Sequence, residues 1–597
     1  MKDSFYDAHL KETDRQLARL HRKLSLLSFG RICSFPTFLA GVLLGYFTHF
    51  GFYFLGVGSL LLFVSLVWIY SGQKKKERFL LAQKQALTRM LGRQTDGWRQ
   101  FSDNGVEFSG ENCPPRGKDL DIFGQNSLYQ YLSRCHTLYG RRELANRLKS
   151  DAPDRERILQ NQQAVKELSQ REDFCLQLET LGILMEQSTR KKDGETVESF
   201  TALSENSPPS LPIFWKILMW ILPFITLFFL ISAIIGIHSS INLGLGFMGV
   251  LLQLLAAGIC WNRNNRILAP LLDFAGSVAP YGAVFAQIES EPFQSKPLQA
   301  LQAEILGAAT ALKALLSVAT AVEARKNPFG FLFLGGLCMW DFHCADRFCC
   351  WIARYGNKIR RWLTAVGELE AHMSLAVPAN VRRESVFPDI EETGPRIMGN
   401  NIKHPLLPEE TAVGNSISLT AQTCVITGSN MSGKTTFLRS IGLNLILAYA
   451  GAPVAAASFS ASPMRVFTSM RVEDNVSQGI STFYAELLRI KDMVEFSGKK
   501  APMICLIDEI FKGTNSADRI VGATETIRRL SVPHGVTLVS THDFELCNLK
   551  NDPRVKALNF HFSEHYTNDG IRFDYKMTPG RCTTTNARYL LKMAGIL

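Results

Sequence analysis

Residues 428–435 read Gly-Ser-Asn-Met-Ser-Gly-Lys-Thr, and this stretch decides the fold of the C-terminal region. It follows the apolar run Cys424–Thr427 and precedes a helix-like run from Thr436 to Tyr449. A glycine-containing loop between a strand and a helix is typical of a P-loop, whose backbone N–H groups surround phosphate oxygens at a helix N-terminus. The sequence therefore predicts a nucleotide site made by Gly428, Ser429, Asn430, Met431, Ser432, Gly433, Lys434, Thr435 and Thr436.

Individual residues of this region are expected to bind phosphate, to bind Mg²⁺ or to activate water. Lys434 is expected to reach the β- and γ-phosphates, and the hydroxyl group of Thr435 to bind Mg²⁺. A second apolar run, Met503–Ile507, ends in Asp508 and Glu509, and Asp508 lies 74 residues after Lys434. We expect Asp508 to hold Mg²⁺ through its water shell and Glu509 to orient or deprotonate the attacking water. Acidic residues also follow many strands that end at the protein surface, so Asp508 and Glu509 alone would indicate little. Together with the P-loop they indicate a site of ATP hydrolysis.

A third apolar run carries a histidine at its end. Leu538–Thr541 is followed by His542, where an α/β sheet of this kind would present a side chain to the γ-phosphate. We predict that His542 senses the γ-phosphate; the alternative is an ordinary surface histidine. From about Arg396 onward, short β-rich runs alternate with helical runs, which is typical of an α/β nucleotide-binding domain. ATP and Mg²⁺ are the expected ligands.

Four long apolar runs precede this region. They lie at about 32–50, 52–70, 217–237 and 241–261, and each has about the 20 residues that a helix needs to cross a bilayer. The connection within each pair is too short for anything but a tight helical turn, so we predict two transmembrane hairpins. The alternative is two hairpins buried in the core of a soluble protein. A shorter apolar stretch, Phe329–Trp340, is followed by Asp341 and favours a buried soluble helix.

The formal charge of +11 is concentrated beside the apolar runs. Residues 1–31 contain seven Lys or Arg and four Asp or Glu, and residues 74–99 contain eight and two. Neither hairpin tip contains Lys or Arg, whereas basic residues flank both hairpins at their other ends. By the positive-inside rule, only the tips face outward. The prediction is a multi-pass protein of the cytoplasmic (inner) membrane, with membrane lipid as a partner and the ATPase domain in the cytoplasm.

A chain of 597 residues is too long for one core, and the apolar runs and a proline-containing linker near 378–395 divide it. The predicted fold is multidomain, with helical transmembrane hairpins, an all-α core or lever domain and a C-terminal α/β P-loop ATPase domain of the ABC type. In chain order we expect a basic cytoplasmic N-terminal helix (1–31), transmembrane hairpin 1 (32–70), a basic linker (71–119), the first part of the helical core (120–210), transmembrane hairpin 2 (211–261), the second part of the helical core or lever (262–380) and the ATPase domain (381–597). The thirteen cysteines include no CxxC pair, which excludes a structural zinc site of the usual spacing.

Four segments of the C-terminal region resemble the ATPase domain of the MutS family of DNA mismatch repair proteins. They are residues 428–435, 481–486, 508–514 and 541–546, in that order. Residues 120–124, 127–129, 140–142 and 163–165 look like the start of that family's helical core, and 365–376 look like its end. His404-Pro405-Leu406 is similar to the lead-in to the ATPase domain. The resemblance covers about residues 118–597.

The resemblance implies a homodimer formed through the ATPase domain, because two ATPase domains face each other in that family. Ser481 matches the serine of a Ser-Thr-Phe motif that touches the γ-phosphate bound by the partner chain. Asn430 matches the P-loop asparagine that senses nucleotide. Ser481 thus joins Glu509 and His542 as a predicted catalytic residue, whereas without the resemblance it would indicate an ordinary helix cap.

Two departures from the family affect the predicted function. No part of the first 118 residues resembles the mismatch-reading module with its Phe-x-Glu wedge, and the second hairpin falls where the family inserts its DNA clamp. We therefore predict a membrane-anchored MutS-like ATPase that binds and hydrolyses ATP at composite dimer sites and thereby moves the helical core. Double-stranded DNA or a membrane protein is a further candidate partner. The alternative is a tethered DNA mismatch repair or DNA-binding ATPase; an ABC-type transporter is disfavoured because few polar residues would line its path.

Overall fold

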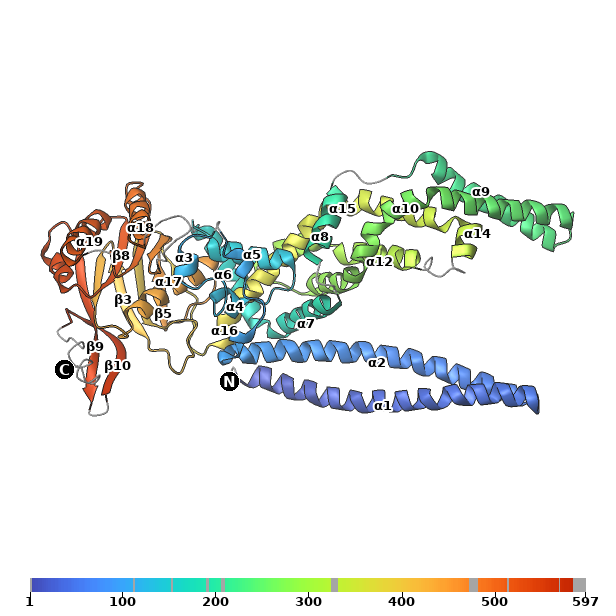
Figure 1. Cartoon of the computed structure of the whole chain (residues 1–597), viewed down its shortest axis with the longest axis horizontal. Helices are drawn as coiled ribbons and strands as arrows, with labels where there is room; N and C mark the ends of the chain where they lie inside the picture. Colours follow the sequence, from blue (N-terminus) through green and yellow to red (C-terminus); the bar gives the residue numbers. More distant parts are fainter. Residues whose placement is uncertain are drawn as a thin grey trace.

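The computed structural model describes residues 3–110, 113–151, 154–188, 193–205, 210–323, 331–471, 482–512, 515–567 and 570–582. An α/β region at one end joins a helical middle region, from which two long helical arms extend in the same direction (Figure 1). A helical N-terminal region and C-terminal mixed sheets agree with the predicted multidomain architecture.

The first arm is an antiparallel pair of long helices, α1 (Asp3–Phe47) and α2 (Phe52–Gln94). Glycines allow the two helices to touch near the tip, since a Cβ atom added at Gly41 would lie 2.6 Å from the backbone nitrogen of Gly56. Most apolar side chains toward the tip are exposed, whereas Leu17, Leu20, Leu24 and Leu80 form a small buried cluster near the base. Residues 71–94, which the sequence assigns to a linker, continue α2 as helix and pack against α7 (Glu172–Ser188).

The second arm consists of α9 (Ile213–Ile234) and the first half of α10 (Ser239–Ser290). Within it the side-chain amide of Gln253 donates to the hydroxyl group of Thr226 at 2.8 Å, which sets the register of the two helices. Helix α10 is 52 residues long and continues from this arm into the helical middle region. One continuous helix therefore connects the arm to the interior of the protein.

The middle region is built around α15 (Trp340–Leu375), against which several other helices pack. The remaining helical elements are η1 (Asp96–Gln100), η2 (Val106–Phe108), α3 (Arg116–Asp119), α4 (Leu128–Leu132), α5 (Leu138–Lys149), α6 (Arg155–Gln170), α8 (Asp193–Glu205), α11 (Lys296–Ile305), α12 (Ala308–Glu323), η4 (Phe331–Gly335), α14 (Gly336–Cys338) and α16 (Val377–Val381). Two large clusters of buried apolar side chains lie in this region, and one of them continues into the α/β region.

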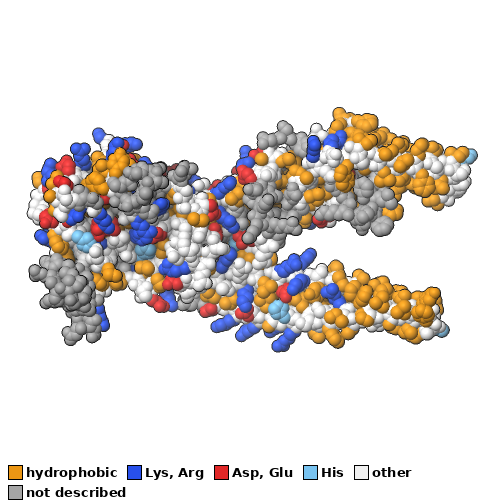
Figure 2. Space-filling model, in the orientation of Figure 1, with side chains coloured by type: hydrophobic (Ala, Val, Ile, Leu, Met, Phe, Trp, Pro, Cys, Tyr) orange, Lys and Arg blue, Asp and Glu red, His pale blue; other side chains and the backbone are white. Residues whose placement is uncertain are grey.

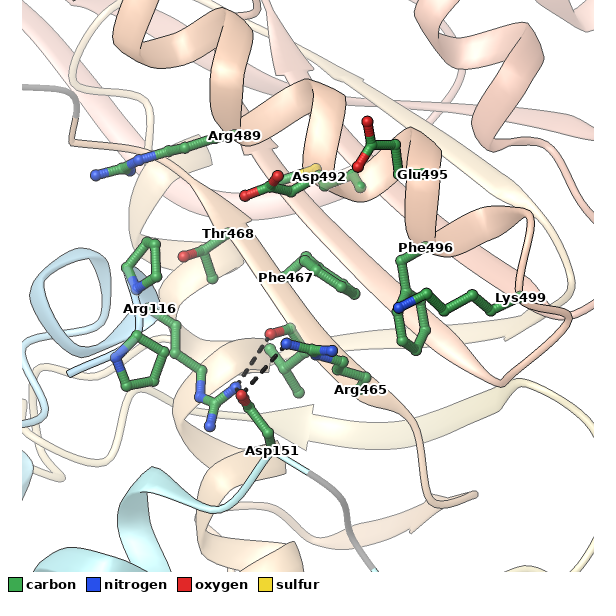
Figure 3. A pocket seen from close by; sticks show the side chains of 14 residues that line it. Arg116, Asp151, Arg465, Phe467, Thr468, Arg489, Asp492, Glu495, Phe496 and Lys499 are labelled. Carbon is green, nitrogen blue, oxygen red and sulfur yellow. Dashed lines mark hydrogen bonds and ion pairs between the residues drawn. The ribbon is translucent and has the colours of Figure 1, made fainter. Parts of the chain in front are cut away.

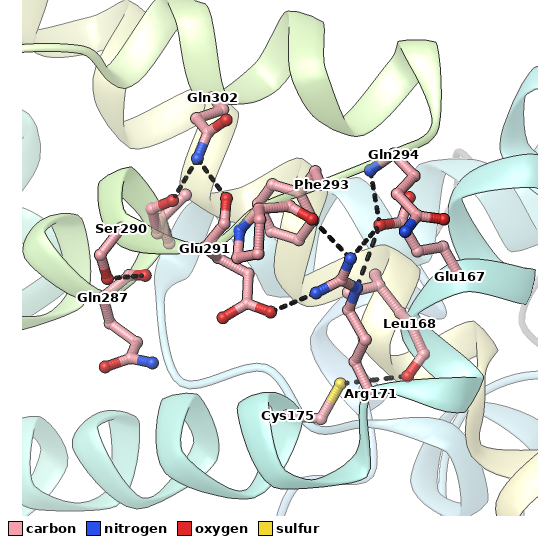
Figure 4. Close-up of polar contacts among 12 residues, drawn as sticks. Glu167, Leu168, Arg171, Cys175, Gln287, Ser290, Glu291, Phe293, Gln294 and Gln302 are labelled. Carbon is pink, nitrogen blue, oxygen red and sulfur yellow. Dashed lines mark hydrogen bonds and ion pairs between the residues drawn. The ribbon is translucent and has the colours of Figure 1, made fainter.

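A polar cluster fastens the inner end of α10 to α6 and α7 (Figure 4). Arg171, between α6 and α7, forms a 2.5 Å ion pair with Glu291, the residue after α10. The carboxylate of Glu167 on α6 accepts hydrogen bonds from the backbone N–H groups of Gln294 (2.8 Å) and Ser295 (2.7 Å). The amide of Gln302 donates to three backbone carbonyls at the end of α10, at 2.7–3.2 Å. The inner end of α10 is thus tied to α6, to Arg171 and to α11 by side-chain contacts.

A buried ion pair lies in the same helical region. Arg134 donates to Glu179 at 2.8 Å, and the two side chains are 1% and 0% exposed. The Glu179→Ala substitution is expected to lower the free energy of unfolding by about 3–5 kcal/mol, because it leaves a buried guanidinium group without its partner. Denaturant unfolding of the purified protein measures this loss. Glu304→Ala, at an exposed position of α11, serves as the matched control and should change little. A Glu179→Ala protein as stable as this control would contradict the prediction.

The C-terminal region contains two sheets. The larger has the strand order β10-β9-β4-β8-β7-β6, in which only the β9–β10 pair is antiparallel. The smaller has the order β1-β5-β2-β3. The strands are β1 (Asp389–Ile390), β2 (Arg396–Ile402), β3 (Asn415–Thr420), β4 (Thr423–Thr427), β5 (Ser458–Ala461), β6 (Arg465–Ser469), β7 (Met503–Asp508), β8 (Gly535–Thr541), β9 (Ala557–Thr567) and β10 (Gly570–Pro579).

Helices α17 (Lys434–Ala450), α18 (Thr482–Ser497) and α19 (Ser516–Leu530), with η6 (Phe544–Asn551), pack on this region. Strands β4, β7 and β8 are buried along their whole length, as expected of central strands covered on both faces. Helix α17 contacts β7 and β8 on one side and α5 and α6 on the other. It therefore joins the sheet directly to the helical middle region.

By length and composition alone, five helical segments of the described chain are apolar enough to cross a membrane. They are Phe5–Phe47, Phe52–Gln94, Ile213–Ile234, Ser239–Leu272 and Lys296–Glu323. The first four contain the apolar runs picked out in the sequence. The fifth, which the sequence analysis did not single out, comprises α11 and α12 and contributes Leu298, Ile305, Leu312 and Leu315 to a buried cluster. This fifth segment is more deeply buried within the protein than the helices of the two arms are.

Candidate nucleotide-binding site

The predicted phosphate loop connects the end of β4 to the start of α17. Gly428 and Gly433 have φ angles of 151° and 108°, which a residue with a side chain rarely adopts. A Cβ atom added at Gly428 would also lie 2.8 Å from the carbonyl oxygen of Phe562 on β9. The two glycines therefore allow both the backbone conformation of the loop and its close approach to β9.

Lys434 is the first residue of α17, and its side chain folds back over the loop. Its ammonium group donates to the carbonyl oxygens of Gly428 and Ser429, both at 2.8 Å, and lies 3.4 Å from Nε2 of His542. Burial lowers the pKa of this ammonium group below its usual value. The only charged group of the loop itself is thus held above the loop, where phosphate oxygens would meet it.

Thr435 and Asp508 lie together at the end of β7. The Thr435 hydroxyl group donates to Oδ2 of Asp508 at 2.7 Å, and the hydroxyl group of Ser540 at the end of β8 donates to Oδ1. A hydroxyl and a carboxylate side by side are oxygen donors of the kind that Mg²⁺ prefers. The donor set fits the predicted ion, with Ser540 orienting the carboxylate, a role that the sequence analysis did not assign.

Glu509 and His542 meet across the ends of β7 and β8. Oε1 of Glu509 lies 3.1 Å from Nε2 of His542, and Oε2 lies 2.9 Å from the ammonium group of Lys512. The hydrogen bond with His542, together with Lys512, outweighs partial burial and lowers the pKa of Glu509 to about 2. Nε2 of His542 also lies 2.8 Å from Oδ1 of Asn430. The imidazole therefore bridges the loop and the acidic residue.

The backbone at Glu509 is unusual for a residue with a side chain. Its φ angle is 56°, in the left-handed region, and its N–H group donates to the carbonyl oxygen of Ser540 at 2.9 Å. Such a conformation costs free energy and is held by its surroundings, often where the position of a side chain matters. Here it turns the chain sharply after β7 and brings the carboxylate toward Lys434 and His542.

Lys434, Thr435 and Glu509 border a cavity of about 470 Å³. The loop residues 429–436 and Glu509 form one side, and Ile402, Leu407, Val413, Asn415 and Tyr575 form much of the other. Tyr575 belongs to β10, in a bulge between Phe573 and Met577, with a φ angle of 56°. Asn415 fixes the bulge, because its amide donates to the carbonyl oxygen of Tyr575 at 3.0 Å and accepts from the N–H group of Met577 at 2.8 Å. Nothing in the sequence pattern indicated Tyr575 or Asn415.

Ser481 lies outside the described residues, so its predicted position at the site stays a prediction. Helix α18 follows it directly, beginning at Thr482. On α18 the carboxylate of Glu486 accepts from the N–H group of Phe511 at 2.6 Å, in the segment that follows Glu509. The helix after Ser481 is thus joined to the acidic end of β7.

Arg489 of α18 also reaches the helical middle region. It forms an ion pair with the fully buried Asp119 of α3 at 3.0 Å. The Asp119 carboxylate further accepts from the hydroxyl group of Thr468 at 2.7 Å, at the end of β6. A pocket lies between α3, β6 and α18, with Arg116, Arg465 and Arg489 among its lining (Figure 3). Asp119 therefore connects the nucleotide-site region to the helices.

Comparison with known proteins agrees with this picture. The helical region and the mixed sheets define a multidomain protein with a C-terminal α/β region. The family model described as MutS domain V matches residues 424–596. The C-terminal region of the chain is thus similar to the MutS family.

Two relatives illustrate the extent of the match. The DNA mismatch repair protein MutS of Natronomonas pharaonis is 31% identical over 252 residues, which are 41% of this chain and 29% of that protein. The DNA mismatch repair protein MutS of Aquifex pyrophilus is 31% identical over 248 residues, 40% of this chain and 28% of that protein. The chain thus spans less than a third of the length of these curated relatives, and the match concerns its C-terminal region.

Proposed function

We propose that this protein is a membrane-anchored, MutS-like ATPase with a C-terminal P-loop ATPase domain. The observation that carries the proposal is the meeting of five side chains from three neighbouring strand ends: Lys434, Thr435, Asp508, Glu509 and His542. Lys434, Thr435 and Glu509 among them line one cavity. Lys434, Thr435, Asp508 and Glu509 are residue types that recur in sites of phosphoryl transfer to water. The match of residues 424–596 to the MutS domain V model supports the same reaction.

In this proposal the loop amides and Lys434 bind the phosphates, and Glu509 orients the attacking water. Thr435 and Asp508 would hold Mg²⁺, which supplies charge stabilisation to the phosphates when bound. With a pKa of about 2, Glu509 remains a carboxylate at any physiological pH, so it is always able to accept a hydrogen bond from water. His542 links Glu509 to Asn430 and so couples the orientation of the carboxylate to the loop. Tyr575 offers an aromatic face for the base of the nucleotide.

We further propose that the two arms are transmembrane hairpins, with the domain boundaries given by the sequence. Their apolar side chains form continuous exposed surfaces, and Lys and Arg side chains gather toward their bases (Figure 2). Phe54 and Trp68 on the first arm and Phe224 and Ile259 on the second are 73–79% exposed, an unfavourable arrangement in water that a bilayer would relieve. With the basic residues at the bases of the arms on the inner side, the proposed ATPase domain lies in the cytoplasm, beneath the cytoplasmic membrane.

The predicted topology can be tested by labelling intact cells with a membrane-impermeant maleimide. Thr48→Cys and Ser239→Cys, at the exposed tips of the two arms, are expected to react, because both tips face outward. Lys75→Cys and Lys500→Cys, which are equally exposed in the structure, should react only after the membrane is permeabilised. The unsubstituted protein controls for its own thirteen cysteines. Reaction of Lys500→Cys in intact cells would overturn the topology.

The second candidate function is a tethered DNA mismatch repair or DNA-binding ATPase, which the names of the relatives favour. Both functions predict ATP hydrolysis by a homodimer, and they differ in what the ATP cycle acts on. The deciding measurement is the ATPase rate of the purified protein with no DNA, with matched duplex and with mismatched duplex. A rate that responds to DNA, with an affinity that falls steeply as salt rises, supports DNA as the partner. A rate that depends on lipid and ignores both duplexes supports the membrane role.

A further inference from the structure

A short apolar segment between α12 and α15 packs against the second arm. It consists of η4 (Phe331–Gly335), a turn of π-helix, and α14 (Gly336–Cys338), and both elements contact α10. The approach is close because Gly336 lacks a side chain: an added Cβ atom would lie 3.1 Å from Cγ1 of Val250 and 3.4 Å from Cγ of Leu254. Helix α14 contacts α9 as well, so the segment sits on the hairpin as a third element.

Residue positions along α9 show how far from the base of the arm Gly336 contacts α10. At the base, Lys216 of α9 forms a 2.9 Å ion pair with Asp346 of α15. Val250 and Leu254 flank Gln253, whose side chain bonds Thr226. Thr226 follows Lys216 by ten residues, which in a helix is a rise of about 15 Å, or half of a hydrocarbon layer about 30 Å thick. Gly336 therefore lies near the level of the membrane centre if the charged base marks the membrane surface.

The exposed side of this segment is apolar, as a position within the hydrocarbon layer requires. Phe333 is 61% exposed, and Leu334, Leu337 and Cys338 are half-buried. The run from Phe331 to Trp340 contains no charged residue. The backbone at Gly335 and Gly336 is buried against the arm, as irregular backbone must be at membrane depth. Met339, with a φ angle of 46°, then turns the chain into α15, which leads back toward the charged level of Asp346.

We propose that residues 331–338 form a re-entrant segment that enters the hydrocarbon layer beside α9 and α10 and contacts lipid acyl chains. The proposal rests on the proposed membrane anchoring of the second arm and adds a third embedded element to it. It replaces the expectation of a buried soluble helix from Phe329 to Trp340, whose first two residues lie outside the described residues. The occupant of the exposed face is lipid because this face continues the apolar surface of the arm at the same depth.

Photo-crosslinking tests the proposal on the full-length protein. Phe333 is replaced by p-benzoylphenylalanine, the protein is reconstituted in phosphatidylethanolamine–phosphatidylglycerol vesicles and irradiated, and the intact mass is measured. The expected result is a mass gain of one phospholipid. Two control positions carry the same substitution: Phe224, 75% exposed on α9, and Leu306, 73% exposed between α11 and α12. We expect a lipid adduct at position 224 and none at position 306.

The controls separate the two ways of failing. If position 224 gives no lipid adduct, the proposed anchoring by the second arm is wrong, and the re-entrant segment falls with it. If position 224 forms the adduct and position 333 does not, anchoring stands and the re-entrant segment is wrong. Cross-linking of position 333 to a second copy of this chain instead of lipid would also overturn the proposal, because it would assign the exposed face to a protein interface.

Discussion

The Glu509→Gln protein is expected to bind ATP as the unsubstituted protein does and to hydrolyse it about 100- to 10,000-fold more slowly. The amide keeps the size of the side chain and removes the negative charge that orients water. It also weakens the pairing with His542 and Lys512, which the carboxylate holds at 3.1 and 2.9 Å. Steady-state phosphate release measures turnover, and displacement of a fluorescent nucleotide analogue measures binding.

Two further variants make this result specific. Lys434→Ala should weaken nucleotide binding itself, because the buried ammonium group above the loop is the proposed counter-charge for the phosphates. Glu525→Gln makes the same chemical change at an exposed position of α19 and should leave both binding and turnover unchanged. Hydrolysis at the unsubstituted rate by the Glu509→Gln protein would remove Glu509 from the proposed mechanism.

The second large effect is the recovery of activity on mixing two inactive proteins. One carries Ser481→Ala with Lys434 intact, and the other carries Lys434→Ala with Ser481 intact. If Ser481 completes the site of the partner chain, a mixed dimer contains one site with unsubstituted Lys434 and Ser481. Its other site carries both substitutions. ATP hydrolysis should therefore reappear on mixing, at up to half the rate per dimer of the unsubstituted protein, because the γ-phosphate would again contact both chains.

The mixed-dimer experiment needs proof that mixed dimers form. Two different affinity tags on the two proteins allow the mixed species to be isolated before its activity is measured. The matched control mixes the Lys434→Ala protein with a Glu509→Gln, Ser481→Ala double variant, in which no site can be complete. If tagged mixed dimers form and stay as inactive as their parents, the role of Ser481 in trans is wrong, and the residue becomes an ordinary helix cap.

Much of the candidate site follows from sequence because its residues stand at fixed places relative to strand ends. The loop after β4 and the acidic residues after β7 are adjacent to apolar runs that can only be central strands. In a parallel sheet, such strand ends share one edge, so Lys434, Asp508 and His542 are predictably neighbours. Their chemical roles stay predictions, and so does the position of Ser481.

Other parts of the site and the fold depend on tertiary contacts that leave no periodic pattern. Tyr575 reaches the cavity through a bulge that Asn415 holds from another sheet, 160 residues earlier in the chain. Residues 71–94 carry the charge of a linker, yet α2 continues through them because Leu80, Ala86, Leu87 and Met90 pack on neighbouring helices. The segment 331–338 is too short for any sequence criterion of a membrane element, and its position is evident only from its contact with α10.

The parallel direction of the two arms has a consequence for assembly (Figure 1). A protein held in a bilayer at one point can rotate about its anchor, whereas two anchors inserted side by side fix its tilt against the membrane plane. If both arms insert as proposed, every copy presents its proposed ATPase domain at the same height and with the same side facing the membrane. Encounters between copies become two-dimensional and partly pre-oriented, which raises their effective concentration. A dimer too weak to persist in dilute detergent would, on this geometry, be well populated in the membrane.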